Sequence, residues 1–439
     1  MSSSFIALIT GVKEVSELVT IITDNGLKYK EDENVIIIYS DENQRTGVEI
    51  ADETKSLIID KKTFQPIASQ FNKILYNADT EKFLSDKDWS NVSIKECFEG
   101  TMIMVFHHND KWYVCTRKCL DAKTSYWVKD VSYFDLFMEV IKDKFTFDDL
   151  NKNYSYHFIL LHHLNKNIVN YTQFGEKYMN VALAMVTEKT TLKKVNCTIN
   201  NKVIYPRTVT CNSLADVKKK LATLSARDVL GKQITIEGFI LEYYVDGKMT
   251  ILKLQTHLYE FVASSKPNVN NLDAMFLELY QRDKLVNIAP FFTQNSRDVV
   301  IRIHNSMRNL TTEFLKMYHI TRNHKSPELY EKLPTSYKNV MYAIHGAFLK
   351  KKVSVDATET TTPVPVVEVA TEEQETMPTK IIDHKSITVN DIYDTLKKVE
   401  AYTLRRVYID RIQLLEDELV RQYLNCDCFD TLLQGRLMN

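Results

Sequence analysis

Short apolar runs rich in β-branched and aromatic residues, bounded by polar turn residues, recur along the first 265 positions. Such runs are typical of β-strands. The clearest case is TMIMVFHHNDKWYVCT at 101–116, where two apolar strands surround a turn at 108–110. A second hairpin is predicted around Asp246-Gly247. The predicted strands lie at 34–40, 55–60, 101–116 and 157–169, and within 233–263.

Apolar residues at helical spacing interrupt these strands and then replace them. At 132–145 they put Tyr133, Phe137 and Val140 on one face of a helix, and at 213–224 an apolar stripe follows a serine cap. Strands followed by helices indicate an α+β fold with antiparallel sheets. The predicted order is a sheet domain at 1–265, a helical domain at 266–352, an acidic flexible linker at 353–385 and a helical tail at 386–439.

Composition narrows the class of protein. The chain has 439 residues, which is long for a single hydrophobic core, so two or more domains are expected. Its 44% hydrophobic and 26% charged residues indicate a soluble globular protein. No run approaches the ~20 apolar residues that span a bilayer, so we expect no membrane partner. Seven scattered cysteines favour a reducing, intracellular location. With a net charge of −1, any nucleic-acid site is expected to be a local groove.

An ordered set of motifs carries the candidate chemistry. Its strongest part is EGTMIMVFHHNDKWYVCTRKCLDA at 99–122. In the order and spacing of its motifs the chain resembles RNA ligases of the covalent nucleotidyltransferase superfamily, above all those of large DNA viruses. The likeness covers about residues 50–265 and implies a nucleotidyltransferase-type fold. The motifs lie at 55–77, 95–101, 113–122, 157–169, 236–241 and 252–259.

The resemblance implies a particular reaction. In that family a lysine amine attacks the α-phosphorus of ATP, which gives a lysyl-AMP intermediate and pyrophosphate. The AMP passes to an RNA 5′-phosphate, and a 3′-hydroxyl then displaces it. The implied cofactors are ATP and Mg²⁺, and the implied partners are RNA ends or tRNA. Such a lysine needs a lowered pKa, which burial and neighbouring cations provide.

The resemblance also assigns roles to single residues. Glu99 matches the acid that orients the ribose, and Gly100 matches a glycine that lets the backbone approach the nucleotide. Glu237 matches an acid that binds metal or holds the nucleophile, and Lys253 matches a lysine on the α-phosphate. The remaining contacts to phosphate, nucleotide or RNA are assigned to Lys55, Arg117 and Lys118.

The nucleophile of the family is missing from its place. Two residues before Glu99 the family has a lysine, whereas this chain has Cys97. Lys95 lies on the same strand face, displaced by about 6–7 Å, and is a candidate substitute. A Cys97 thiolate is a second candidate, and a small residue that fills a buried strand is the structural alternative. Two more polar positions of the family hold Leu160 and Gln255.

Two functions therefore stay open. The first is ATP-dependent RNA end joining or repair through an enzyme-AMP intermediate. The second is a non-catalytic descendant that binds RNA or a nucleotide, or that acts as a structural component of a viral complex, with a protein partner on the tail at 386–439. A capping guanylyltransferase or a DNA ligase needs the missing lysine and is disfavoured. The viral resemblance implies the host cytoplasm or the virion as location.

Three other patterns have structural explanations that we favour. Cys115 and Cys119 lie four residues apart, without a second pair at metal-ligand spacing. Trp112 and Trp127 are typical of a core more than of a base-stacking platform. The basic run at 218–220 is typical of the solvated face of a helix, with a phosphate contact as the alternative.

Overall fold

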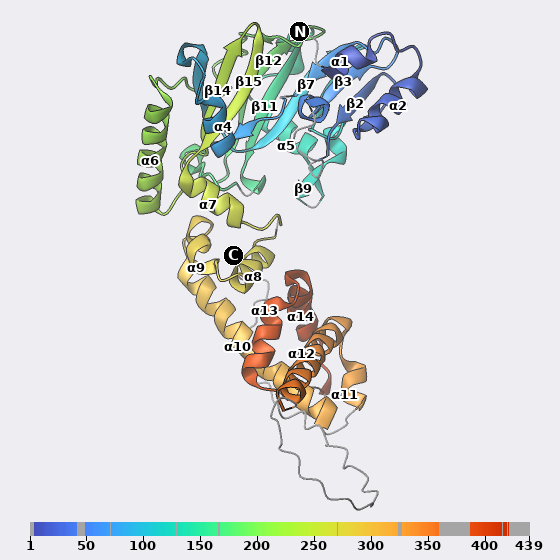
Figure 1. Ribbon diagram of the computed structural model, residues 1–439, viewed down its shortest axis with the longest axis vertical. Coiled ribbons are helices and arrows are strands. Elements are labelled where there is room, and N and C mark those ends of the chain that lie inside the picture. The colour runs from blue at the N-terminus through green and yellow to red at the C-terminus, as the bar shows by residue number, and fades with distance from the viewer. Residues whose placement is uncertain are drawn as a thin grey trace, which may run out of the picture. The chain divides into compact units, whose positions relative to one another are not determined.

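The computed structural model divides into two compact units, 1–264 and 265–439 (Figure 1). Helices and antiparallel sheets occur together in the first unit, and the described part of the second is helical, which confirms the predicted α+β class. No described helix is long and apolar enough to cross a membrane. The structure describes residues 4–41, 49–70, 72–128, 130–165, 167–269, 271–323, 327–359, 387–414, 416–418 and 420.

The first unit is built on three larger sheets and a two-stranded ribbon within its described residues. Their strand orders are β1-β2-β3-β4, β13-β12-β11-β7-β8, β5-β15-β14-β6 and β10-β9, and every pairing except β15 with β5 is antiparallel. The strands are β1 Lys28–Glu31, β2 Val35–Tyr39, β3 Leu57–Asp60, β4 Pro66–Ser69, β5 Leu75–Tyr76, β6 Val92–Cys97, β7 Thr101–His108, β8 Lys111–Cys115, β9 Tyr126–Val128, β10 Val131–Ser132, β11 Tyr154–His162, β12 Met179–Glu188, β13 Lys194–Val195, β14 Gly238–Val245 and β15 Lys248–Gln255. The helices are α1 Ser4–Ile9, α2 Val15–Asp24, α3 Glu49–Glu53, α4 Asn77–Leu84, α5 Tyr133–Ile141, α6 Leu214–Gly231 and α7 His257–Ser265.

Both predicted hairpins form. Asn109 and Asp110 join β7 to β8 with φ of 45° and 58°. Asp246 and Gly247 join β14 to β15 with φ of 51° and 73°. Positive φ at both turn positions matches the right-handed twist of the flanking strands, so these two short sequences fix local structure by themselves.

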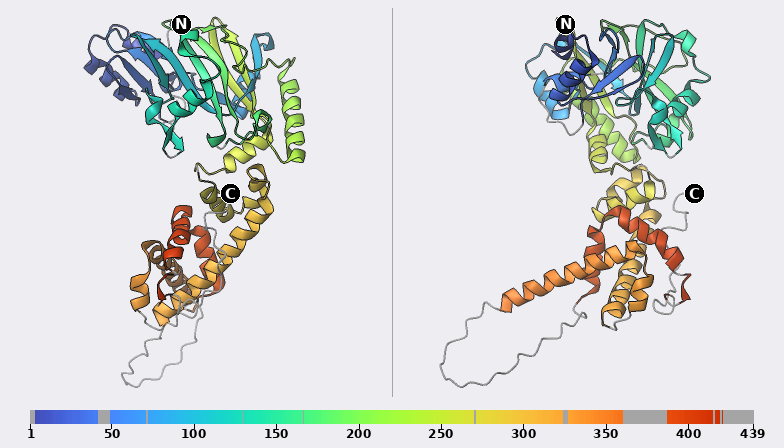
Figure 2. Two further views of the ribbon diagram at one scale, coloured as in Figure 1. Left: turned by 180° about the vertical axis from the view of Figure 1, so that it is seen from behind. Right: turned by 90° about the vertical axis from the view of Figure 1, so that its right-hand side faces the viewer.

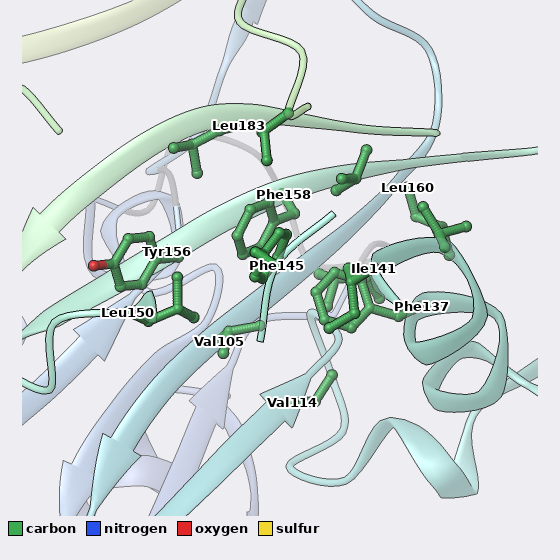
Figure 3. Close-up of a cluster of buried hydrophobic side chains, with 14 of the residues drawn as sticks. Val105, Val114, Phe137, Ile141, Phe145, Leu150, Tyr156, Phe158, Leu160 and Leu183 are labelled. Carbon is green, nitrogen blue, oxygen red and sulfur yellow. The ribbon is translucent and has the colours of Figure 1, made fainter. Parts of the chain in front are cut away.

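Hydrophobic cores lie on the faces of the sheets. The sheet that contains β2 and β3 packs on the five-stranded sheet, where Ile37 and Ile58 share a cluster with Phe106. α5 covers the other face of the five-stranded sheet, and its Phe137 packs 5.5 Å from Phe158, ring centre to ring centre (Figure 3). α4 and α6 cover one face of the sheet β5-β15-β14-β6. The other face of that sheet carries most of its polar side chains, among them Lys95, Glu242 and Lys253.

Two predicted elements have different ends in the structure. The strand predicted at 157–169 stops at His162, because the loop that follows bonds to Glu99 instead of to a strand. The helix predicted at 213–224 continues to Gly231 after the predicted serine cap, Ser213, which accepts a hydrogen bond from the Asp216 amide at 3.2 Å.

The second unit packs the described helices of the predicted tail against those before it. α13 and α14 contact α8, α10 and α12 (Figures 1 and 2). A buried ion pair between Arg411 Nε and Glu313 Oε2, 2.8 Å apart, joins α14 to α10. Tyr337 of α12 donates to the same carboxylate at 3.0 Å. The helices are α8 Leu272–Gln281, α9 Leu285–Ile288, α10 Ser296–Asn323, α11 Pro327–Lys332, α12 Thr335–Glu359, α13 Val389–Lys398 and α14 Ala401–Leu414.

The predicted acidic linker at 353–385 lies mostly outside the described residues. Its first part continues α12 to Glu359, beyond the predicted end at 352, because no proline interrupts that stretch and the next one is Pro363. Residues 421–439 of the predicted tail also lie outside the described residues.

Candidate functional site

The candidate site lies on the polar face of the sheet β5-β15-β14-β6. Lys95, Ile240 and Lys253 stand opposite one another across β6, β14 and β15, and so do Cys97, Gly238 and Gln255. Directly paired residues share a face. The other face carries the apolar side chains that pack against α4 and α6: Ile94, Phe239, Leu241, Leu252 and Leu254.

Glu237 is the centre of this face. Its Oε1 accepts hydrogen bonds from Lys253 Nζ at 2.8 Å and from Gln255 Nε2 at 2.9 Å, and its Oε2 accepts one from Cys97 Sγ at 3.4 Å. The residue is only 4% exposed. Asn77 Nδ2 in turn donates to Gln255 Oε1 at 3.0 Å, which orients the amide. One buried carboxylate therefore holds a cation, an amide and a thiol in fixed positions.

Cys97 is a neutral donor in this arrangement. Burial raises the pKa of its thiol well above the ordinary value, and the charge of Glu237 raises it further. A nucleophilic cysteine needs a lowered thiol pKa. The surroundings of Cys97 therefore favour the thiol that bonds to Glu237 over the thiolate considered from the sequence.

Lys253 is a fixed cation. Burial alone opposes its charged form, but the Glu237 carboxylate, 2.8 Å away, raises its pKa above the ordinary value. Its Nζ also lies 5.4 Å from the centre of the Tyr76 ring. A permanently charged ammonium is suited to hold a phosphate and is a poor nucleophile.

Lys95 shares the strand face of Cys97, but its amine belongs to a second cluster. Its Nζ donates to both carboxylate oxygens of Glu242 at 3.2–3.3 Å. Lys194 Nζ donates to the same carboxylate at 2.6 Å, and Tyr244 donates to it at 3.0 Å. Burial opposes the charged form of Glu242, yet the hydrogen bond and charge of Lys194 keep its pKa below the ordinary value. Attack by Lys95 would first require release from this carboxylate.

Glu99 is held by a loop that sequence reasoning did not connect to it. Its Oε2 accepts from the Val169 amide at 2.7 Å, and its carbonyl accepts from Asn167 Nδ2 at 2.9 Å and from the Tyr171 hydroxyl at 3.0 Å. The same hydroxyl accepts from the Glu99 amide at 2.8 Å. Burial raises the pKa of Tyr259, and the charges of Glu237 and Glu99 raise it further, so both acids lie near this tyrosine.

Two glycines in the site region serve strand packing. A Cβ on Gly100 would lie 2.6 Å from the side chain of Ile159 and from the carbonyl oxygen of Leu160. A Cβ on Gly238 would lie 2.1 Å from the carbonyl oxygen of Leu254. The close approach that Gly100 permits is therefore to β11. Leu160 itself is buried in the α5 core, where an acid has no polar partner (Figure 3).

A group of cations borders the Glu237 cluster. Asp52 lies 3.9 Å from Lys55 Nζ and 3.1 Å from Lys73 Nζ. Burial lowers the pKa of Lys55, and the charges of Arg117 and Lys73 lower it too, while Asp52 opposes them. Burial raises the pKa of Tyr76 and the nearby charge of Glu237 adds to this, while the charges of Lys253 and Arg117 oppose it. Arg117 therefore lies near Lys55 and near Tyr76, and the Tyr76 ring lies 5.4 Å from Lys253 Nζ.

Lys118 belongs elsewhere. Its Nζ lies 3.5 Å from Asp41, whose other carboxylate oxygen is paired with Lys28 at 2.6 Å. The assigned residues therefore separate into a central set and two outlying ones. The central set is Lys55, Cys97, Glu99, Arg117, Glu237 and Lys253, and the outlying residues are Lys95 and Lys118.

Buried polar groups without protein partners adjoin Lys55. Backbone hydrogen bonds join Ser40 to Thr54 at 2.9 Å and Gln70 to Ser56 at 2.8 Å. Among the described residues, the three hydroxyls and the Gln70 amide nitrogen have no hydrogen-bond partner. Each such group costs about 1–3 kcal/mol when it stays unsatisfied, so a ligand rich in oxygen atoms fits this position.

The residues fit a phosphate ligand better than a resident metal ion. Nowhere in the described part of the chain do three or more His, Cys, Asp or Glu side chains gather as a metal site. Glu237, the predicted metal ligand, already accepts hydrogen bonds from three donors. Magnesium in proteins is often held by one or two carboxylates together with phosphates of the substrate, so an ion here would arrive with its nucleotide.

Comparisons with known proteins give distant structural neighbours. No known family profile matches the chain, and no curated protein matches it in sequence. Two forms of an archaeal ATP-dependent RNA ligase match at 10% identity, with TM-scores of 0.40 and 0.41, over 69% of this chain and 79% of theirs. A candidate ATP-dependent DNA ligase from Aquifex aeolicus matches at 10% identity with a TM-score of 0.38, over 66% of this chain and 71% of its own. Similarity at this level defines neither a family nor an activity.

Proposed function

We propose that the first unit is a ligase-like domain that binds a nucleotide or an RNA 5′-phosphate without forming a covalent intermediate at Cys97. The observation that carries the proposal is the Glu237 cluster, in which a buried carboxylate holds Lys253 charged and Cys97 protonated. This combination supplies phosphate-binding charge and removes the nucleophile. Of the two functions that the sequence leaves open, it favours the non-catalytic one.

Each side chain has a definite task in this proposal. Lys253, fixed by Glu237, presents a permanent positive charge, and Arg117 adds a second one near Tyr76. Lys55 and the unsatisfied hydroxyl of Ser56 provide donors for further phosphate or ribose oxygens. ATP, when bound, would supply the phosphates for these donors, and Mg²⁺ would neutralise part of their charge.

Catalysis is the second candidate function, and one observation favours it. Lys95 lies on the same face of β6 as Cys97. A substrate that displaced Glu242 from Lys95 would free an amine close to the bound nucleotide. RNA end joining through an enzyme-AMP intermediate requires this rearrangement.

The decisive experiment separates binding from covalent labelling. Purified protein is incubated with Mg²⁺ and α-labelled ATP or GTP, while calorimetry measures equilibrium binding of ATP and of a 5′-phosphorylated RNA. We expect binding without an acid-labile adduct. Lys253→Ala should weaken binding about 10- to 150-fold, the value of a charge-assisted hydrogen bond, whereas Lys118→Ala should not.

Two outcomes would contradict the proposal in different ways. If neither ATP, GTP nor the RNA end binds, the phosphate site does not exist. If the wild-type protein is labelled stoichiometrically, the protein is an enzyme, and loss of the label in Lys95→Ala would identify its nucleophile. Cys97→Lys tests whether the missing amine accounts for the absence of an adduct, because this variant should show labelling that the wild type lacks.

A further inference from the structure

α10 has two sharply different faces along its 28 residues. One face is buried in the helical unit and is mostly apolar, and the other is exposed or half-buried and mostly polar, with Ile301 as an exposed apolar exception. Only two acidic residues occur in the whole helix, and one of them, Glu313, is buried against Arg411. The buried apolar positions are Val299, Ile303, Met307, Leu310, Phe314, Met317 and Tyr318.

The outward face of α10 is strongly basic. Arg297, Arg302 and Arg308 are exposed and Lys316 is half-buried. At 100° and 1.5 Å per residue these four cations fall within a sector of about 140° and extend over about 28 Å. Asp298 is the single acid of this sector in the helix. Between the cations lie the amides of Asn305 and Asn309 and the exposed side chain of Ile301. The Thr312 hydroxyl also lies there, but it donates to the Arg308 carbonyl at 3.2 Å.

These charges are not used within the described protein. No ion pair joins any of the four cations to another residue that the structure describes. The lysines of α6 differ in this respect, because Lys218 pairs with Glu81 at 2.9 Å and Lys220 donates to the Thr210 carbonyl at 2.7 Å. A set of unpaired cations on one helix face repels itself and is relieved by an anionic partner.

We propose that the outward face of α10 binds the phosphodiester backbone of a nucleic acid strand. A row of cations about 28 Å long faces several successive phosphates, and the amide side chains of Asn305 and Asn309 between them donate to phosphate and sugar oxygens. A membrane surface fits poorly, because an interfacial helix needs its apolar face for the lipid and α10 buries that face in protein. The inference does not rest on the nucleotide site of the first unit.

Salt dependence of binding tests this proposal with the full chain. Fluorescence anisotropy measures the affinity for a labelled single-stranded RNA and for DNA of the same sequence between about 50 and 200 mM salt. The variant Arg297→Gln/Arg308→Gln/Lys316→Gln should bind at least tenfold more weakly. The slope of log affinity against log salt should fall by about 2, because each single-strand phosphate contact contributes about 0.7.

A matched variant controls for net charge. Lys142→Gln/Lys152→Gln/Lys177→Gln removes the same charge from exposed positions of the first unit and should leave affinity and slope unchanged. Circular dichroism should show both variants folded, since all six side chains lie outside the cores. Equal binding of RNA and DNA supports recognition of the backbone, and preference for RNA supports it with an added contact to the 2′-hydroxyl.

Three results would overturn the inference. The first is wild-type protein that binds neither nucleic acid. The second is an α10 variant that has the affinity and salt slope of the wild type, or a control variant that loses as much affinity as the α10 variant does. The third is displacement of the RNA by polyglutamate as effectively as by unlabelled RNA, which would assign the face to acidic protein segments.

Discussion

Removing the Glu237 carboxylate should destabilise the first unit strongly. Lys253 and Glu237 have side chains only 13% and 6% exposed, and Glu237→Ala leaves a buried ammonium without its partner. Loss of one member of a buried pair costs about 3–5 kcal/mol. The exposed pair between Lys218 and Glu81 offers a control, since Glu81→Ala should cost less than about 1 kcal/mol.

Urea unfolding followed by tryptophan fluorescence measures this cost in the correct unit. All three tryptophans, Trp89, Trp112 and Trp127, lie in the first unit, so the signal does not report the second. With a slope of about 2–3 kcal/mol/M, the midpoint should fall by about 1–2.5 M. A loss no larger than that of Glu81→Ala would refute the view that Glu237 holds the cluster together.

Replacing both partners distinguishes stability from function. Glu237→Leu/Lys253→Met exchanges a buried ion pair for apolar groups of similar size and should recover stability to within about 1–2 kcal/mol of the wild type. Nucleotide binding should nevertheless be lost, because the Lys253 ammonium is absent from this variant. The folded pKa of Lys253 is raised, so its pairing contributes fully below the ordinary lysine value of about 10.4 and is lost as pH rises through the folded value. The penalty of Glu237→Ala should therefore be constant between about pH 6 and 9.

Three further outcomes follow from packing and burial. Gly100→Ala should lower the free energy of unfolding by more than about 2 kcal/mol in urea titrations, because the added Cβ meets the Leu160 carbonyl. Gly346→Ala has open space around it and should stabilise α12 by up to about 1 kcal/mol. Equal effects of the two variants would contradict the packing around Gly100. Leu160→Asp should prevent folding of the first unit, visible as lost near-ultraviolet circular dichroism, and a folded variant would mean that an acid is accommodated there. The Cys97 thiol should react with a thiol reagent only when the protein unfolds, whereas the half-buried Cys119 should react in the folded protein. Fast labelling of Cys97 in the folded protein, mapped by mass spectrometry, would contradict its burial and raised pKa.

On the polar face of the β6-β14-β15 sheet, Cys97 is a neutral hydrogen-bond donor to Glu237. The resemblance drawn from the sequence assigns Cys97 to the nucleophile position, and in the structure Cys97 and Lys253 both donate to Glu237. The sulfur bonds to the carboxylate, which would otherwise lose a donor. The viral source, the cellular location and a protein partner of the tail remain predictions from the sequence alone.

Much of the local structure was determined by the sequence itself. The turns at Asn109-Asp110 and Asp246-Gly247 and the capped start of α6 are decided by residues close to one another in the sequence. Such features depend on φ preferences, capping and side-chain period, and these act over short distances. The shared strand face of Lys95 and Cys97 follows from the same period.

Only the tertiary structure decided which partner each polar side chain meets. Strand alternation placed Lys95 on the correct face but gave no sign that Glu242 and Lys194 hold its amine. No local sequence pattern around Glu99 predicted its backbone hydrogen bonds with the Tyr171 hydroxyl. Lys95 and Glu242 are 147 positions apart in the sequence, and Glu99 and Tyr171 are 72 positions apart. These contacts depend on strand register and loop closure, which the packing of whole sheets fixes and which no local pattern encodes.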